Sequence, residues 1–272
     1  MATPEKPSID PVALGDLAKR AARVGGETLL AWREKFTTRE KGPADLVTDA
    51  DLASQRAVRE LLLTERPDDC FVGEESAAED ATPAEREGRL CWVVDPLDGT
   101  SNYVHGFPMF ATSIGAVLDG ELIAGAVYDP LRDEMFSASR GGGAWLGEQR
   151  IETTDATQLG EALVAVSLPP RVDANSPDLA GFVSVVQACR AVRRTGSAAL
   201  NLSYVAAGRL DAHWAHVIQP WDAAAGVLIA QEAGACVTDS RGEPFDVWKA
   251  DYLIASTAEL HNAVLSQMKR RD

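Results

Sequence analysis

The chain has 272 residues, 46% of them hydrophobic, and a formal net charge of −15 at pH 7. This length and apolar content can supply one large core or two closely packed lobes. The acidic balance argues against nucleic acid as a partner, because affinity for phosphate backbones comes mainly from clustered Lys and Arg. No apolar run approaches the ~20 residues that a bilayer requires, and residues 1–9 lack the apolar core of a signal peptide. We therefore expect a cytoplasmic protein without a membrane partner, whose residues 1–9 form a loose tail.

The first half of the chain predicts two helices and then an antiparallel meander. Asp10-Pro11 is typical of a helix start, with an N-cap residue followed by proline, and apolar residues keep helical spacing from Leu14 to Val24. A second helix is expected near residues 51–63. Strands are expected at 91–94, 112–118, 122–128 and 134–138, with Asp119-Gly120 as the hairpin turn between the second and third of these.

Two loop segments leave an alternative open. The acidic stretch 74–87 is most simply a solvated loop, although a mobile flap over a neighbouring site is also possible for a long loop. The run Arg140-Gly141-Gly142-Gly143 resembles a phosphate-cradling loop, but it lies between strands and lacks a following helix and lysine. We interpret the glycine run as a flexible turn.

The second half of the chain alternates helices and strands. Helices are expected at 179–188, 197–207, 223–233 and 257–269, and strands at 163–167, 211–215, 235–238 and 252–255. No linker rich in Pro, Gly or Ser separates the halves, and no internal repeat is evident. We therefore treat residues 1–272 as one domain with lobes at about 10–150 and 151–272; the pattern alone predicts an α+β or mixed α/β fold.

The four cysteines form no ligand or disulfide pattern. They are scattered among apolar neighbours without C-x-x-C spacing, at Cys70, Cys91, Cys189 and Cys236. This distribution favours buried, reduced thiols over a disulfide framework or a zinc site.

The segment from Trp92 to Pro108 reads W-V-V-D-P-L-D-G-T-S-N-Y-V-H-G-F-P and places two acids on a stiff turn. Asp95 follows an apolar strand, and Asp98 comes three residues later, directly before Gly99-Thr100. Two acids so spaced can bracket Mg²⁺, which takes oxygen ligands at roughly 2.0–2.1 Å. The backbone N–H groups at Gly99 and Thr100 can donate hydrogen bonds to a phosphate if they begin a helix. Taken alone, the motif is also compatible with an ordinary Asx/Pro turn.

Further acids follow other predicted elements. Glu74-Glu75 comes after the short apolar run Phe71-Val72, and Asp222 precedes the predicted helix 223–233. Each has an ordinary alternative, a solvated surface pair for the glutamates and an N-cap for Asp222. Because acids at strand ends and helix starts can converge, the three segments together predict one acidic site.

The ordered segments G-E-E-S, W-V-V-D-P-L-D-G-T-S-N-Y and W-D-A-A-A resemble the signatures of the inositol monophosphatase family. The early segment D-L-V-T-D-A-D at 45–51 and the late segment R-R-T-G-S-A-A-L at 193–200 are similar to two further stretches of that family, so the resemblance covers about residues 10–265. It implies a layered α-β-α-β-α sandwich, commonly a homodimer, with two or three Mg²⁺ ions between the lobes. It also implies a lithium-sensitive phosphatase that acts on a small phosphorylated metabolite.

The resemblance also assigns roles to individual residues. The implied metal ligands are Glu74, Asp95, the carbonyl of Leu97, Asp98 and Asp222. Glu74 and Thr100 would activate the attacking water, Asp51 would orient Thr100, and Thr48 is either a support for this pair or a simple strand-end threonine. The implied substrate contacts are Gly99, Thr100, Ser197, Ala198 and Asp222.

The specificity segment departs from the family pattern. Inositol-directed members carry a glutamate seven residues before the W-D aspartate, and here that position is Ala215. His213 and His216 are either substrate contacts or satisfied structural histidines, and Trp214 is expected to pack in the core. Arg193 and Arg194 either reach an anionic group or a dimer partner, or form surface salt bridges.

The sequence therefore predicts Mg²⁺-dependent hydrolysis of a small phosphate monoester, with inositol 1-phosphate as the leading substrate. Related enzymes handle histidinol phosphate, fructose 1,6-bisphosphate and 3′-phosphoadenosine 5′-phosphate, and Ala215 keeps these open. An alternative of another class is a non-catalytic protein that binds metal or phosphate and regulates a partner.

Overall fold

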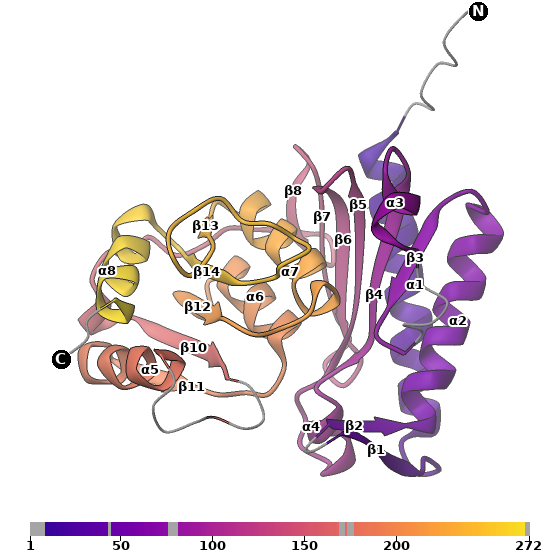
Figure 1. Cartoon of the computed structure of the whole chain (residues 1–272), viewed down its shortest axis with the longest axis horizontal. Coiled ribbons are helices and arrows are strands. Elements are labelled where there is room, and N and C mark those ends of the chain that lie inside the picture. The colour runs from indigo at the N-terminus through magenta and orange to yellow at the C-terminus, as the bar shows by residue number, and fades with distance from the viewer. Residues whose placement is uncertain (1–8, 43–44, 76–80, 169–171, 173–176, 270–272) are drawn as a thin grey trace, which may run out of the picture.

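The computed structural model describes residues 9–42, 45–75, 81–168, 172 and 177–269. Its elements form five layers, in which a helix pair, a seven-stranded sheet, a second helix pair, a five-stranded sheet and a third helix pair follow one another across the molecule (Figure 1). The fold is therefore α+β and layered in the predicted α-β-α-β-α order.

The first layer consists of α1 (Pro11–Trp32) and α2 (Asp49–Glu65). The side chain of Asp10 accepts a hydrogen bond from the N–H of Val12 and satisfies one of the free donors at the start of α1. Both predicted helices are confirmed, and both are longer than predicted. Their apolar faces cover one side of the large sheet.

The seven-stranded sheet has the order β3-β4-β5-β6-β7-β8-β9, and only the β3–β4 pair is parallel. Its strands are β3 (Cys70–Gly73), β4 (Leu90–Asp98), β5 (Ala111–Leu118), β6 (Glu121–Asp129), β7 (Glu134–Ser139), β8 (Gly143–Leu146) and β9 (Gln149–Ile151). The predicted meander is confirmed, and Asp119 and Gly120 both have positive φ, as a tight hairpin turn requires. Residues 140–142 form a turn between β7 and β8, as predicted, and Gly143 begins β8.

The five-stranded sheet has the order β11-β10-β12-β14-β13. Its strands are β10 (Leu163–Ser167), β11 (Ala191–Arg193), β12 (Ala212–Ala215), β13 (Cys236–Thr238) and β14 (Tyr252–Ala255). The helices α5 (Pro177–Ala188) and α8 (Ala258–Met268) cover its outer face. Both helices, and all these strands except β11, were predicted.

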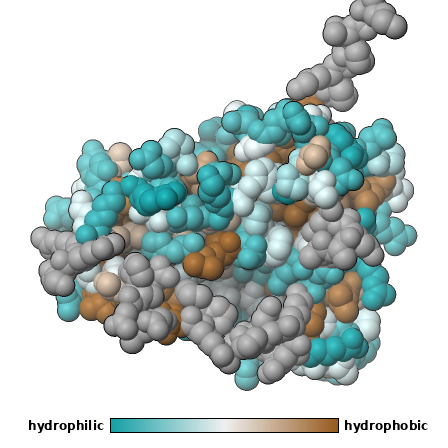
Figure 2. Space-filling view, in the orientation of Figure 1, coloured by the Kyte–Doolittle hydropathy of each residue, from teal (hydrophilic) through white to brown (hydrophobic). Residues whose placement is uncertain are grey.

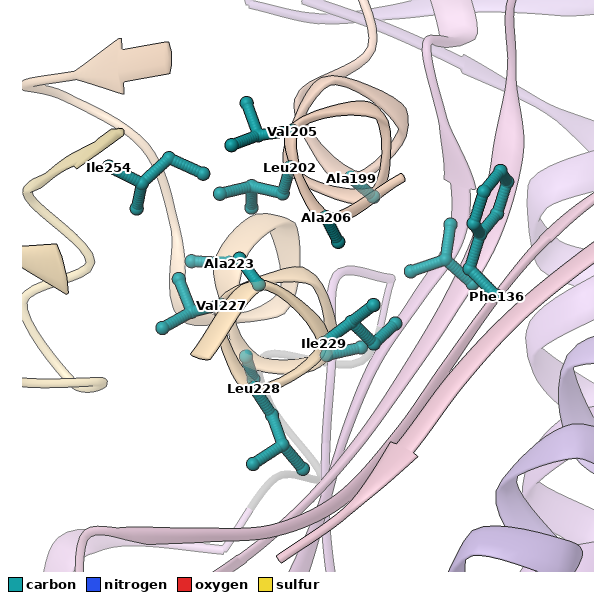
Figure 3. Close-up of a cluster of buried hydrophobic side chains, with 14 of the residues drawn as sticks. Phe136, Ala199, Leu202, Val205, Ala206, Ala223, Val227, Leu228, Ile229 and Ile254 are labelled. Carbon is teal, nitrogen blue, oxygen red and sulfur yellow. The ribbon is translucent and has the colours of Figure 1, made fainter. Parts of the chain in front are cut away.

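Helices α6 (Ala198–Ala206) and α7 (Pro220–Glu232) lie between the sheets. Figure 3 shows Phe136 of the large sheet on one side of this pair and Ile254 of the small sheet on the other. A Cβ atom at Gly115 would lie 2.8 Å from Cβ of Ala224, so only glycine allows α7 to approach β5 this closely. This contact fixes the start of α7 against the large sheet.

Several elements differ from the sequence prediction. Helix α7 begins at Pro220, so Asp222 lies inside its first turn and is not an N-cap. The acidic stretch 74–87 is not only a loop, because the short helix α3 (Pro83–Arg86) lies in it; residues 76–80 are outside the described part. The hairpin β1 (Thr38–Gly42) and β2 (Asp45–Thr48) and the 3₁₀ helix at Leu159–Glu161 were also missed.

The cysteines and the surface agree with the sequence analysis in part. All four cysteines are free thiols, but only Cys70 and Cys91 are buried; Cys189 and Cys236 are half-buried, contrary to the prediction. The face in Figure 2 is mostly hydrophilic, with apolar residues in separated groups. Among the described residues, the helices are too short or too polar to span a bilayer.

Candidate metal centre

Three carboxylates converge where β4 ends and α7 begins. One oxygen each from Asp95, Asp98 and Asp222 lie within 4.8 Å of one another. Asp95 and Asp98 are almost fully buried. The structure therefore brings together three of the four acids that the family resemblance implies as metal ligands, although that role stays a prediction.

The backbone of β4 is irregular between the two aspartates, and this irregularity aims both side chains at one point. The pairing of β4 with β5 shifts register between Asp95 and Asp98. Asp95 accepts a hydrogen bond of 2.9 Å from the N–H of Leu97. The carbonyl of Pro96 accepts hydrogen bonds from the hydroxyls of Ser54 and Thr112, each at 3.1 Å. The turn is thus held from both sides.

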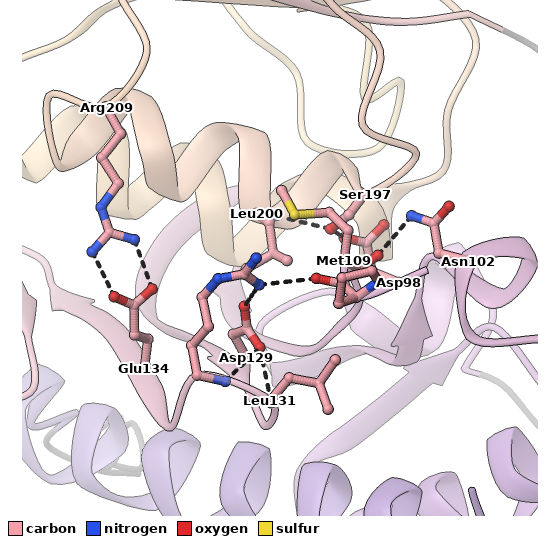
Figure 4. Close-up of polar contacts among 11 residues, drawn as sticks. Asp98, Asn102, Met109, Asp129, Leu131, Glu134, Ser197, Leu200 and Arg209 are labelled. Carbon is pink, nitrogen blue, oxygen red and sulfur yellow. Dashed lines mark hydrogen bonds and ion pairs between the residues drawn. The ribbon is translucent and has the colours of Figure 1, made fainter. Parts of the chain in front are cut away.

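Asp98 is held by the start of α6. Its carboxylate accepts a hydrogen bond from the hydroxyl of Ser197 (Figure 4). It also accepts hydrogen bonds from the N–H groups of Ala198 (3.0 Å) and Ala199 (2.9 Å). Ser197 and Ala198 were predicted as substrate contacts; in the structure their donors face Asp98. The sequence analysis missed Ala199, although it lies in the quoted G-S-A-A stretch.

Asp222 closes a capping box at the start of α7. Its carboxylate accepts a hydrogen bond of 2.8 Å from the N–H of Gln219. One oxygen of the same carboxylate belongs to the group of three. A capping role and a ligand role are therefore compatible for this residue, which the sequence analysis had treated as alternatives.

The electrostatics of the cluster favour a bound cation. Burial raises the pKa of Asp95 well above its ordinary value, and the charges of Glu74, Asp98 and Asp222 raise it further. Burial and the charge of Asp222 raise the pKa of Asp98 to about 7. Among the described residues, neither a lysine nor an arginine lowers these pKa values. A site of buried, uncompensated carboxylate oxygens fits a hard divalent cation such as Mg²⁺.

Glu74 lies beside the cluster but outside its 4.8 Å group. It follows β3 and extends the parallel ladder through a hydrogen bond of 3.2 Å from its N–H to the carbonyl of Val94. Its charge nevertheless acts on Asp95. The neighbouring Glu75 is fixed differently, because its N–H donates to the side-chain oxygen of Gln55 at 2.9 Å.

The predicted pair of Thr100 and Asp51 is in contact. The hydroxyl of Thr100 lies 3.3 Å from a carboxylate oxygen of Asp51 and 3.1 Å from the carbonyl of Leu97. Asp51 is fully buried and accepts hydrogen bonds from the N–H and the hydroxyl of Thr48, which caps α2. Thr48 ends β2 and caps α2, and the same hydrogen bonds hold the carboxylate of Asp51, so its support of the Thr100–Asp51 pair stays a prediction.

Gly99 precedes the short helix α4 (Thr100–Val104) with φ of 95°. A Cβ atom there would lie 2.9 Å from the carbonyl oxygen of Met109. Glycine is thus required at this position by its conformation and by a backbone contact. Phosphate binding by Gly99 and Thr100 stays a prediction, and five residues give α4 only a small dipole.

His213 lies in the interior of the fold, on β12. It is fully buried, and burial lowers its pKa to about 3, so it is neutral. Its Nε2 lies 2.8 Å from the hydroxyl of Tyr252, which the sequence analysis did not single out. Trp214 is buried in the outer core, as predicted. His216 is half-buried, and its Nδ1 lies 3.9 Å from a carboxylate oxygen of Asp251.

Ala215 is fully buried and pairs with Tyr252 across β12 and β14. Directly paired residues point to the same face of a sheet, about 5 Å apart. Burial raises the pKa of the Tyr252 hydroxyl, and the charges of Asp222 and Asp98 raise it further. Tyr252 thus stands beside the carboxylate cluster on the face where a longer side chain at position 215 would project.

Arg193 and Arg194 bond to backbone carbonyls. Arg193 reaches the carbonyl of Val192 at 3.1 Å, and Arg194 reaches that of Leu168 at 3.5 Å. Neither distance assigns them a ligand, and both roles that the sequence left open stay predictions.

Stability of the metal-free chain is expected to fall as the pH rises. The pKa of Asp98 is raised from 3.8 to about 7 in the folded chain, so between these values the folded chain holds a proton that the unfolded chain has lost. Stability falls with rising pH wherever the folded state binds more protons. Thermal unfolding in chelator, at about pH 5.5 and about pH 8, measures this. Asp98→Asn is the control and should flatten the dependence; an equal slope in both proteins would contradict the assignment.

A model of the inositol monophosphatase family matches residues 12–271. The inositol-1-monophosphatase of Rhizobium meliloti (strain 1021) is 40% identical over 203 residues, which cover 74% of this chain and 75% of that protein. The Nus factor SuhB of Vibrio cholerae is 37% identical over 258 residues, 93% of this chain and 95% of that protein. The crystal structure of the extragenic suppressor protein suhB from Bartonella henselae matches with a TM-score of 0.87 at 33% identity, over 96% of this chain and 100% of that one. These matches confirm the resemblance inferred from the motifs, and the chain belongs to the inositol monophosphatase family.

Proposed function

We propose that the protein is a Mg²⁺-dependent phosphatase that hydrolyses a small phosphate monoester. The observation that carries the proposal is the convergence of buried Asp95 and Asp98 with half-buried Asp222 beside the Thr100–Asp51 pair. Such a group has a use in phosphoryl transfer, because bound Mg²⁺ would lower the pKa of a water and neutralise developing charge on the phosphoryl oxygens. Two or three ions are expected from the family.

The chain's own residues have distinct tasks in this proposal. Asp95, Asp98, Asp222, Glu74 and the Leu97 carbonyl would hold the cations. The Thr100 hydroxyl would orient the attacking water together with Glu74, and pass its proton toward buried Asp51. Backbone N–H groups at Gly99 and Thr100 would donate hydrogen bonds to the negatively charged phosphoryl oxygens.

The proposed substrate is inositol 1-phosphate. Its support is the relative from Rhizobium meliloti, which is named an inositol-1-monophosphatase. Histidinol phosphate, fructose 1,6-bisphosphate and 3′-phosphoadenosine 5′-phosphate stay open, because Ala215 offers no carboxylate to a polyol hydroxyl. Lithium inhibition, a homodimer and a cytoplasmic location are proposed on the family resemblance and on the acidic composition of the chain.

The alternative class is a regulatory protein that has lost turnover. The name Nus factor of the Vibrio cholerae relative keeps this class in view. However, Glu74, Asp95, Asp98, Thr100 and Asp222 are all retained here. A purely regulatory chain has no physical need for a water-orienting hydroxyl beside a buried acid, so we favour the hydrolase.

Phosphate release from a panel of phosphorylated metabolites tests the proposal directly. The panel contains the four metabolites named above and glycerol 2-phosphate, each with Mg²⁺ and with excess chelator. We expect Mg²⁺-dependent release with inositol 1-phosphate among the best substrates. Absence of release from every compound by folded protein that binds Mg²⁺ would favour the regulatory class.

Ala215→Glu alone is expected to destabilise the fold. The new carboxyl would be buried opposite Tyr252, among apolar side chains and near Asp222 and Asp98. Burying such a group without a partner costs about 2 kcal/mol or more, which lowers Tm by about 4 °C or more in a chain of this size. Calorimetry of the variant measures the shift.

The double variant Ala215→Glu with Tyr252→Ala opens room for the carboxylate. If position 215 faces the leaving group, kcat/KM for inositol 1-phosphate relative to glycerol 2-phosphate should rise about tenfold or more, since a hydrogen bond to a charged group contributes about 1.5–3 kcal/mol. Tyr252→Ala alone is the control. An unchanged ratio in a folded double variant would show that position 215 does not contact the substrate.

A further inference from the structure

Asn102 joins two segments that are far apart in the chain. Its side-chain N–H groups donate to the carbonyl of Met109 at 2.6 Å and to the carbonyl of Thr195 at 2.8 Å. Asn102 belongs to α4 beside the large sheet, whereas Thr195 lies just before α6. Figure 4 shows Asn102 beside Met109, close to the Asp98–Ser197 contact. One amide thus holds the two segments together.

The two segments meet at the level of their backbones. A Cβ atom at Gly196 would lie 2.9 Å from the side-chain amide nitrogen of Asn102. A Cβ atom at Gly99 would lie 3.3 Å from the backbone carbonyl oxygen of Gly196. Both glycines have positive φ. The chain at 195–197 therefore has little freedom to move while the amide of Asn102 is in place.

The segment that Asn102 holds is the one that holds Asp98. Directly after Thr195 and Gly196 come the three donors to the Asp98 carboxylate, namely the Ser197 hydroxyl and the N–H groups of Ala198 and Ala199. Thr195 is also tied to α6, because its hydroxyl donates to the side-chain oxygen of Asn201 at 2.8 Å. A shift of this segment would move all three donors at once.

We infer that Asn102 is a positioning residue for the metal centre: by holding residues 195–197 it keeps the Ser197–Ala199 donors on Asp98 and so sets the affinity of the centre for its cation. This inference rests on the proposed function, since it assumes that Asp98 is a metal ligand. The partners that orient metal ligands typically change affinity 10–100-fold when they are lost.

Mn²⁺ binding, measured by calorimetry without substrate, tests the inference. We expect Asn102→Ala to raise the Kd for Mn²⁺ about tenfold. The matched control is Arg132→Gln, which removes a hydrogen bond of 3.0 Å to the carbonyl of Pro108 on the same loop, together with an ion pair to Asp129. Among the described residues, the hydrogen bonds of the Arg132 side chain do not involve residues 195–199. The Kd of this control for Mn²⁺ should stay within about twofold of the parent value, even if its Tm falls as far as that of Asn102→Ala.

A double-variant cycle separates positioning from general loosening. Because Asn102 and Ser197 are proposed to act through the same carboxylate, Asn102→Ala should add little to the effect of Ser197→Ala on the Mn²⁺ Kd. If Asn102→Ala does not fold, Asn102→Asp has the same shape without the amide donors and takes its place. An unchanged Kd, or fully additive effects, would overturn the inference. Failure of the parent protein to bind Mn²⁺ would instead contradict the proposed function, and the inference with it.

Discussion

Removal of divalent cations is expected to abolish phosphate release, and added Mg²⁺ to restore it. Without a cation, Asp95, Asp98 and Asp222 offer a phosphate dianion only carboxyl oxygens, which cannot attract its negative charge. Metal ions contribute several kcal/mol to transition-state charge stabilisation, so the loss should reach at least about a thousandfold at about 1.36 kcal/mol per decade. Initial rates of phosphate release in chelator, and after Mg²⁺ is returned in excess, measure the effect.

The adjacent glutamates provide a matched pair of variants for this prediction. Glu74→Gln removes a charge that acts on Asp95 and should reproduce most of the loss, with a higher Mg²⁺ requirement. Glu75→Gln changes the next residue, whose N–H is fixed by Gln55, and should keep most of the activity. Equal losses in both variants, or turnover that persists in excess chelator, would contradict a metal centre at this place.

Local chemistry explains why so much of the fold could be predicted from the sequence. The start of α1 has its signals within a few residues, since Asp10 caps and Pro11 begins the helix. The meander also has local signals, because Asp119-Gly120 fits a tight turn and the flanking residues are apolar. In contrast, β11 has only three residues, and its strand conformation depends on pairing with β10, from which α5 separates it in the chain.

The candidate metal centre could likewise be predicted from the sequence only in part. Asp95, Asp98 and Asp222 each carry a local signal, a strand end or a helix start, so their convergence could be expected. The groups that hold them come from distant segments, such as Ala199 on Asp98 or Asn102 on the carbonyl of Thr195. Backbone donors have no residue signature, so only the folded structure identifies them.

Position 215, where inositol-directed members of the family carry a glutamate, shows a different limit of prediction from sequence. Ala215 was noticed in the sequence because it lacks the family's carboxylate, but the sequence does not reveal what replaces it. The structure places Tyr252 opposite Ala215 in the adjacent strand, 37 residues further along the chain. An aromatic ring there changes the expected outcome of Ala215→Glu from a gain in selectivity to a loss of stability.

Thr100→Ala is expected to lower kcat about a hundredfold or more with little change in KM, as does the loss of one preorganised polar group at other active sites. The hydroxyl of Thr100 contacts Asp51 and the Leu97 carbonyl, whereas the three carboxylates that converge belong to Asp95, Asp98 and Asp222. Its removal should therefore leave metal binding intact while the attacking water loses its orientation. Steady-state kinetics at saturating Mg²⁺, together with a Mn²⁺ binding isotherm, measure both properties.

Two variants distinguish a role in orienting water from a packing role. Thr100→Ser keeps the hydroxyl and should retain activity within about tenfold, while Thr100→Val keeps the shape and should be as slow as Thr100→Ala. Asp51→Asn should also lower kcat, because the buried carboxylate that accepts from Thr100 and Thr48 becomes neutral. If Thr100→Val were as active as Thr100→Ser, the methyl groups rather than the hydroxyl would matter, and the proton path from water through Thr100 to Asp51 would have to be abandoned.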